Sequence, residues 1–194
     1  DLVAPSSVTS LATPMVSAAA AMLVQLGNGN SALSTDPVSK FTTNRQGNVI
    51  RNAERVEVIK AALMAGALRS TSGNVAAPDL TDYRATVGNQ TTNGLDRRFG
   101  AGQLNVGNSY HIIAAGEKNS LQDSSAGGGQ AGLRGFDYDP RFGGAVGTNN
   151  NAATYYFPVQ ATAANFTFSL VWNLKIHGGS TGNFNGTATL YNLD

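Results

Sequence analysis

The sequence predicts an α/β fold followed by an incomplete all-β domain, and three observations carry this prediction. Apolar side chains lie all round a helix over Met15 to Leu26, as in a helix covered on every side in a layered α/β domain. The composition turns rich in Gly, Asn and Ser between residues 119 and 152. Beyond that stretch, apolar and polar residues alternate from Asn165 to Leu174, which is typical of a half-buried strand.

Composition limits the class of protein. A chain of 194 residues suits one domain or parts of two, and its apolar fraction of 41% is ample for a packed core. Thirteen Lys and Arg against 12 Asp and Glu give no basic stripe, so we expect no nucleic-acid partner. The absence of cysteine excludes disulfides, thiolate metal sites and a cysteine nucleophile. The chain starts without Met and stops within an expected strand, so we expect it to be a piece of a longer protein.

The first helix is expected to begin with Thr13 as N-cap and Pro14 in the first helical position, and to stop at Gly27. Its apolar stretch of a dozen residues is shorter than the roughly 20 that a transmembrane helix needs, so we expect no transmembrane segment. No Lys or Arg precedes Lys40, which also argues against a signal peptide. What remains is a buried helix.

The other elements follow in order. An amphipathic helix is predicted over 52–67 and a third helix over 106–115, with a long surface excursion at 70–98 between them. Strands are predicted over 153–159, 165–174 and 187–193. These strands are too few to close a sandwich, so the β domain is expected to be incomplete.

Ser10 is the candidate with the clearest chemistry. It stands in the run TSLATPMV, directly ahead of the first predicted helix. Backbone N–H groups at a helix N-terminus lack intrahelical partners and lie at the positive end of the helix dipole. Such groups can hold the oxyanion that forms when a serine attacks a carbonyl, which is commonly worth ~3 kcal/mol per donor. The alternative is an ordinary turn or capping serine.

Four segments then resemble one family in that family's own order. TSLATPMVSAAAAML, residues 9–23, resembles the segment around the nucleophile of subtilisin-like serine proteases, and DLVAPS, residues 1–6, is similar to the stretch before it. RVEVIKAALMAGA at 55–67 and RFGAGQLNVGNSYHIIAAG at 98–116 resemble two later motifs. FTFSLVWNLKI and ATLYNLD are similar to strands of jelly-roll domains that often follow such proteases.

The resemblance implies a domain organisation. Residues 1–118 would be the C-terminal part of a subtilisin-like protease domain, and residues 119–152 a linker or set of loops. Residues 153–194 would begin a β-sandwich or jelly-roll-like domain.

The resemblance also implies a function. Ser10 would be the nucleophile of a serine endopeptidase, with its backbone N–H as an oxyanion donor and Thr9, Ala12 and Pro14 as motif neighbours. In this family the Asp and His of the triad precede the serine. They are not in this chain, so the rest of the catalytic domain is required and the isolated chain is expected to be inactive. The substrates would be proteins or peptides, and the location extracellular or the cell envelope.

The sequence departs from the family pattern at two positions. Val8 and Ala18 stand where the family has Gly. Because Gly permits close backbone approach, these changes support an alternative: a non-catalytic pseudoprotease remnant with a β-sandwich module that binds proteins or glycans. His111 and His177 occupy no family catalytic position and are expected to be surface residues or polar residues with satisfied hydrogen bonds.

No cofactor is expected. Asp137 and Asp139, in FDYDP, could join a calcium site, although such residues more often begin a turn before a proline. The aromatic residues of the predicted strands could line a carbohydrate site, but their alternation places them in a core first. These are Tyr155, Tyr156, Phe157, Phe168 and Trp172.

Overall fold

The computed structural model describes residues 2–70, 85–91, 95–123, 128–142, 151–158 and 166–172, and the backbone of 175–177 and 187–189. Within these residues the α-helices are α1 (Thr9–Gly29), α2 (Val56–Gly66) and α4 (Val106–Ala114). The short 3-10 helices are η1 (Ser31–Leu33), η2 (Asn52–Glu54) and η3 (Val87–Asn89). The strands are β1 (Phe41–Thr43), β2 (Val49–Arg51), β3 (Lys175–His177) and β4 (Thr187–Thr189).

The helix α1 starts earlier and ends later than expected. Its N-cap is Val8, and the amides of Leu11 and Ala12 both donate to the Val8 carbonyl, at 3.2 and 3.1 Å. Pro14 therefore lies inside the helix rather than in its first position. In that place Pro14 has no N–H for the carbonyl four residues earlier, so the helix lacks one of its internal hydrogen bonds. The helix also continues past Gly27, to a C-cap at Asn30.

Gly27 is used for close packing rather than as a helix stop. It is buried, and a Cβ built on it would lie 2.7 Å from the carbonyl oxygen of Ala53 in η2. One residue later, the side chain of Asn28 donates to Glu54 Oε2 at 3.1 Å. The C-terminal end of α1 is thus held tightly against η2.

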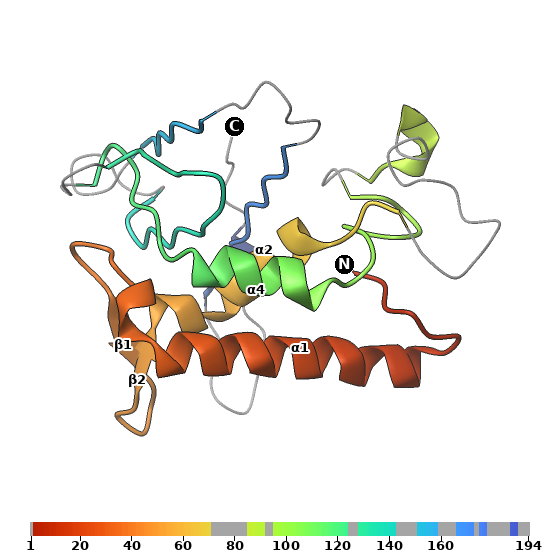
Figure 1. The fold of residues 1–194 in the computed structure, drawn as a ribbon, viewed down its shortest axis with the longest axis horizontal. Helices are drawn as coiled ribbons and strands as arrows, with labels where there is room; N and C mark the ends of the chain where they lie inside the picture. Colours follow the sequence, from red (N-terminus) through yellow and green to blue (C-terminus); the bar gives the residue numbers. More distant parts are fainter. Residues whose placement is uncertain are drawn as a thin grey trace.

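The second and third predicted helices are confirmed as α2 and α4, with η2 preceding α2. These two helices cross at Gly66, where a Cβ would lie 2.6 Å from Ser109 Oγ. Figure 1 shows α1 running along one side of this pair. The core between them is made of Ala19, Leu23, Leu33, Ala53, Val58, Ile59, Ala62, Leu63, Ile113 and Phe136.

The expectation that α1 is wrapped on every side is wrong for the part of the chain that the structure describes. Its buried residues are Ala19, Leu23 and Gly27, whereas Leu11 and Met22 are 60% and 61% exposed. At 21 residues without a charge, α1 is also long and apolar enough to cross a membrane, contrary to the length argument above. A core helix and a signal sequence pass the same test, and only 17% of the most apolar part of α1 is buried in the described structure.

Two short antiparallel pairs make up the named strands of the described chain. The hairpin β1 and β2 pairs Phe41 with Arg51 and Thr43 with Val49, and the sequence did not predict it. The pair β3 and β4 joins Lys175 to Thr189. Isolated bridges add a parallel pairing of Val3 with Gln103.

The predicted fold class is therefore wrong. The described chain is a small mixed α/β structure in which helices dominate, and no second domain of β-sandwich or jelly-roll type is present in it. Residues 153–158 have one isolated bridge, at Tyr156, and residues 166–172 have no strand pairing. The alternation of apolar and polar residues fails as a strand signal here. It indicates that a segment could have one apolar and one polar face, but it does not show that a neighbouring strand is present to hydrogen-bond with it. The end of the third predicted strand lies outside the described residues.

The described parts of the expected linker, 119–123, 128–142 and 151–152, contain no helix or strand. They are nevertheless tied to the helices, because Phe136 pairs with Glu117 in a parallel bridge and is itself only 8% exposed in the core. Gln130 pairs with Tyr156 farther along. Most of the predicted excursion at 70–98 lies outside the described residues.

Candidate functional site

Ser10 is the second residue of α1 and is exposed. The turn before it is formed by Ser6, whose Oγ accepts from the Val8 amide at 3.3 Å and donates to the Val8 carbonyl at 3.2 Å. This local hydroxyl pairing is typical of the chain just ahead of a helix. The structure therefore places Ser10 within the first helical turn rather than ahead of the helix, because α1 begins at Thr9 and not at Pro14.

Two amides at this end of the helix remain available. In the described chain the N–H groups of Thr9 and Ser10 have no hydrogen-bond acceptor, since the first helical bonds start from Leu11. Pro14 has no N–H to donate to the Ser10 carbonyl four residues earlier. The helix terminus at Ser10 thus offers free donors and the positive end of its dipole.

Val8, which stands where the resemblance leads one to expect Gly, has φ −137° and ψ 143°. This is ordinary extended backbone that any residue adopts, and the Val8 side chain is 49% exposed. The described turn therefore does not require glycine at this position. Ala18, the second departure, lies exposed on the outer side of α1.

Two of the three motif neighbours line a cavity to which Ser10 does not belong. Thr9 and Ala12 line an apolar cavity of about 420 Å³ between the N-terminal segment, α1 and α2. Leu2 and Val56 close it from the two other sides. Ser10 is not among the lining residues, so its hydroxyl lies outside this cavity.

The described residues bring no acid or base to Ser10. Its Oγ has no hydrogen-bond partner among them. His111 is exposed on α4, with its ring edge-on to Tyr110 at 5.6 Å between ring centroids. For His177, on β3, only the backbone is described. What the described site holds is an exposed serine hydroxyl beside two backbone amides without acceptors.

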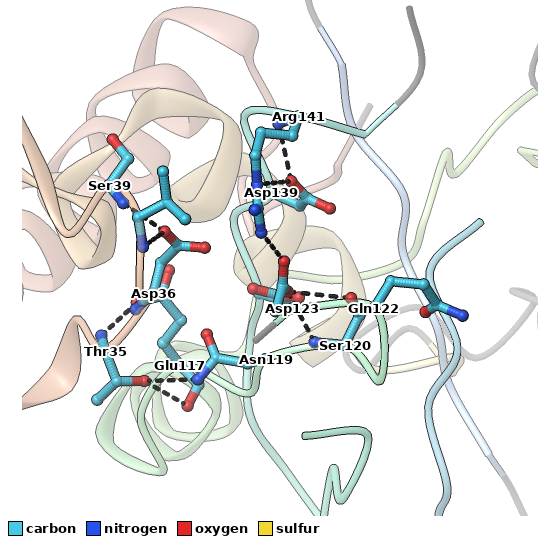
Figure 2. Close-up of polar contacts among 12 residues, drawn as sticks. Thr35, Asp36, Ser39, Glu117, Asn119, Ser120, Gln122, Asp123, Asp139 and Arg141 are labelled. Carbon is cyan, nitrogen blue, oxygen red and sulfur yellow. Dashed lines mark hydrogen bonds and ion pairs between the residues drawn. The ribbon is translucent and has the colours of Figure 1, made fainter. Parts of the chain in front are cut away.

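A second polar cluster lies around Glu117, which is 5% exposed (Figure 2). Its Oε2 accepts from the amides of Thr35 and Asp36, the second at 2.8 Å, and its Oε1 accepts from Asn52 Nδ2 at 2.8 Å. Burial raises the pKa of Glu117 although these hydrogen bonds favour its charged form. This carboxyl joins the segment after η1 to η2 and to the end of α4.

A third cluster surrounds Arg141 (Figure 2). Its guanidinium pairs with Asp123, whose side chain is fully buried, and lies 3.8 Å from Asp139. The other oxygen of Asp123 accepts from both the amide and the hydroxyl of Ser120, each at 3.0 Å. The cluster fixes the loop at 120–123 to the loop at 139–141.

Asp137 and Asp139, the calcium candidates, have protein partners. Asp137 Oδ2 accepts from the Tyr155 hydroxyl at 2.6 Å, and Asp139 Oδ1 accepts from the Arg141 amide at 2.7 Å. Burial, followed by neighbouring acidic groups, raises the pKa of Asp137 to about 7. No three His, Cys, Asp or Glu side chains among the described residues gather as metal ligands would, and calcium stays a prediction.

Sequence reasoning missed the Glu117 and Arg141 clusters. Their members are far apart along the chain: Asp36 and Glu117 are separated by 81 residues. None of these residues belongs to a spaced motif, so a single sequence carries no signal that would join them. Comparisons of the chain with protein-family models, with curated proteins and with solved structures give no significant match.

Proposed function

We propose that this chain carries the nucleophile of a serine endopeptidase, with Ser10 as the attacking residue. The observation that carries the proposal is the position of Ser10 in the first turn of α1, exposed and beside the unpaired amides of Thr9 and Ser10. The resemblance of residues 9–23 to the nucleophile segment of subtilisin-like proteases supports it. Peptides or proteins would be the substrates, in an extracellular or cell-envelope setting.

The chemistry follows from this geometry. Ser10 Oγ attacks a peptide carbonyl while a histidine takes its proton, and the oxyanion is held by the Ser10 N–H. The histidine then protonates the leaving amine, and water hydrolyses the acyl-enzyme. A histidine and an aspartate from polypeptide outside these 194 residues complete the triad, so the isolated chain does not hydrolyse peptides.

The test is labelling with a fluorophosphonate probe in the complete polypeptide. We expect labelling that disappears in Ser10→Ala and persists in Ser17→Ala, a matched change at another exposed serine of α1. The same probe should leave the isolated 194-residue chain unlabelled. Absence of Ser10 labelling in folded complete protein refutes the proposal, and so does Ser10-dependent peptide hydrolysis by the isolated chain.

A second candidate is a non-catalytic binding protein. It is favoured by one observation, that no described acid or base reaches Ser10. The labelling experiment separates the two candidates, because a binding protein has no reason to react with the probe in a Ser10-dependent manner.

A further inference from the structure

One side of α1 is apolar and exposed in the described chain. Four exposed residues recur along the helix at steps of four, three and four, which places them on the same side of it. They are Leu11, Met15, Ala18 and Met22, and we call them the α1 face. No charged residue occurs anywhere in α1. The α1 face is therefore a continuous apolar strip without a charge of its own.

The hairpin of β1 and β2 brings positive charge to one end of this strip. Arg51 of β2 is joined to that end, because its Nη1 donates to the Asn28 carbonyl at 3.1 Å. Figure 1 shows the turn of the hairpin reaching past α1 on the side away from α2 and α4. Lys40 and Arg45 are exposed there, and neither forms an ion pair with a described residue. Phe41, next to Lys40, is 55% exposed.

These cations have no exposed acid beside them in the sequence. Asp36 is the single acidic residue between positions 2 and 53, and it is fully buried. An uncharged apolar strip next to unpaired cations is complementary to an anionic bilayer, in which hydrocarbon lies below a layer of negative headgroups. A soluble polyanion would match the cations alone, and an uncharged apolar ligand would match the strip alone.

We propose that the α1 face and the β1–β2 hairpin dock on the surface of an anionic lipid bilayer. Leu11 and Met22 would enter the outer edge of the hydrocarbon, and Lys40 and Arg45 would pair with headgroup phosphates. The helix would lie in the plane of the membrane and not cross it. Gly27 is packed against the Ala53 backbone, so a crossing helix would have to leave its place in the fold.

A second copy of the chain fits the α1 face less well. A helix of 21 residues is about 30 Å long and about 10 Å wide, so its face offers ~300 Å². A stable protein interface buries about 800 Å² on each partner. The α1 face alone is therefore too small for a stable dimer.

This proposal does not rest on Ser10. Ser10 precedes Leu11 by one residue, so it lies about 100° around the helix from the α1 face. Membrane docking and labelling of Ser10 are measured separately, and either can fail without the other.

The test is flotation of the full chain with lipid vesicles of two compositions. One contains phosphatidylcholine alone, and the other contains phosphatidylcholine with phosphatidylglycerol, which is anionic. We expect the chain to float with the anionic vesicles at low salt and to stay behind with the neutral ones. About 1 M NaCl should release it, because the charges are then screened.

Two double variants test the charges. Lys40→Gln with Arg45→Gln should weaken binding to the anionic vesicles at least about tenfold. Arg97→Gln with Arg134→Gln removes the same number of charges from exposed residues outside the proposed surface, and should bind as the unchanged chain does. Equal effects of the two double variants would show that net charge alone governs binding, and would overturn the proposal.

A pair of single variants tests the apolar strip. Met22→Ser should weaken binding at least about fivefold, because it removes an apolar side chain from the bilayer. Leu133→Ser, at a residue 68% exposed in the loop at 131–142, is the matched control and should have no effect. Circular dichroism verifies the fold of each variant.

Three further results would overturn the proposal. They are equal flotation with and without phosphatidylglycerol, unchanged binding of Met22→Ser, and a dimer in sedimentation that Met22→Ser abolishes. The last result would show that a second copy covers the α1 face.

Discussion

Gly27 of α1 lies against the backbone of Ala53, so closely that a Cβ on Gly27 would be 2.7 Å from the Ala53 carbonyl oxygen. The obstacle is backbone, which cannot rotate out of the way as a side chain end can. Gly27→Ala should therefore force α1 and η2 apart and lower the free energy of unfolding by about 1–3 kcal/mol.

Gly29, in the last turn of the same helix, is the matched control. A Cβ there meets nothing within 4 Å, so Gly29→Ala should be neutral or stabilise by up to ~1 kcal/mol. Urea unfolding of both variants measures the difference. Equal effects of the two substitutions would contradict the close approach of α1 to η2.

Glu117→Gln should destabilise the chain by ~2 kcal/mol. Both oxygens of Glu117 accept from N–H groups, so the N–H₂ of the new side-chain amide would face another hydrogen-bond donor. Rotating Asn52 does not relieve this conflict: its Nδ2 also donates to the Ser39 carbonyl, at 2.7 Å, and its Oδ1 accepts from Arg55. Glu57→Gln, at a partly exposed position, should change stability by less than about 0.5 kcal/mol. Urea midpoints of the two variants test this, and similar values would argue against the Glu117 network.

Arg141→Met should lower stability by about 3–5 kcal/mol, since it removes the guanidinium that pairs with the fully buried carboxylate of Asp123. Arg45→Met is the matched control, because it removes the same charge from an exposed residue in the turn between β1 and β2. This substitution should leave the free energy of unfolding nearly unchanged. Thermal unfolding of both proteins measures the difference. A stable Arg141→Met chain would mean that Asp123 is not held as described.

Asp137 makes stability depend on pH. Burial raises the pKa of this carboxyl in the folded chain from its ordinary 3.8 to about 7, so the folded state holds the proton more tightly than the unfolded state does. The stabilisation is complete below the unfolded pKa and is lost as the pH rises through the folded one. Between about pH 5 and about pH 8 the free energy of unfolding should fall by ~2–3 kcal/mol.

Asp137→Asn removes the titrating group while keeping an oxygen that can accept from the Tyr155 hydroxyl. The difference in unfolding free energy between the original chain and this variant, measured by urea at both pH values, isolates the contribution of Asp137. A pH dependence that is the same in the two proteins would show that Asp137 does not titrate in this range.

The sequence located the helices well and the strands poorly, for one physical reason. A helix closes its hydrogen bonds within itself, so the spacing of Val56, Ile59 and Leu63 was enough to place α2. A strand needs a partner, and the alternation of 166–172 does not say where one is. The hairpin β1 and β2 is short and exposed, and so left no apolar pattern to detect.

The candidate site shows the same difference between what local sequence predicts and what depends on tertiary contacts. Ser10 could be placed at a helix N-terminus because Thr9 to Val16 is one continuous local signal. The expected start of α1 at Pro14 is five residues too late, because proline is common in the first helical position but lies inside this helix. The partners of Glu117 depend on tertiary contacts across 81 residues, which no local pattern encodes.

The bridge between Glu117 and Phe136 has a consequence for how the polypeptide can be shortened. A chain ended at residue 118, where the composition suggests a boundary, would lose Phe136 from the core and open a hole against the helices. A chain ended after Phe142 would keep Phe136 together with the pairing of Arg141 and Asp123. The smallest folded piece that retains the Ser10 helix in its present packing is therefore expected to extend 28 residues beyond α4, to Phe142.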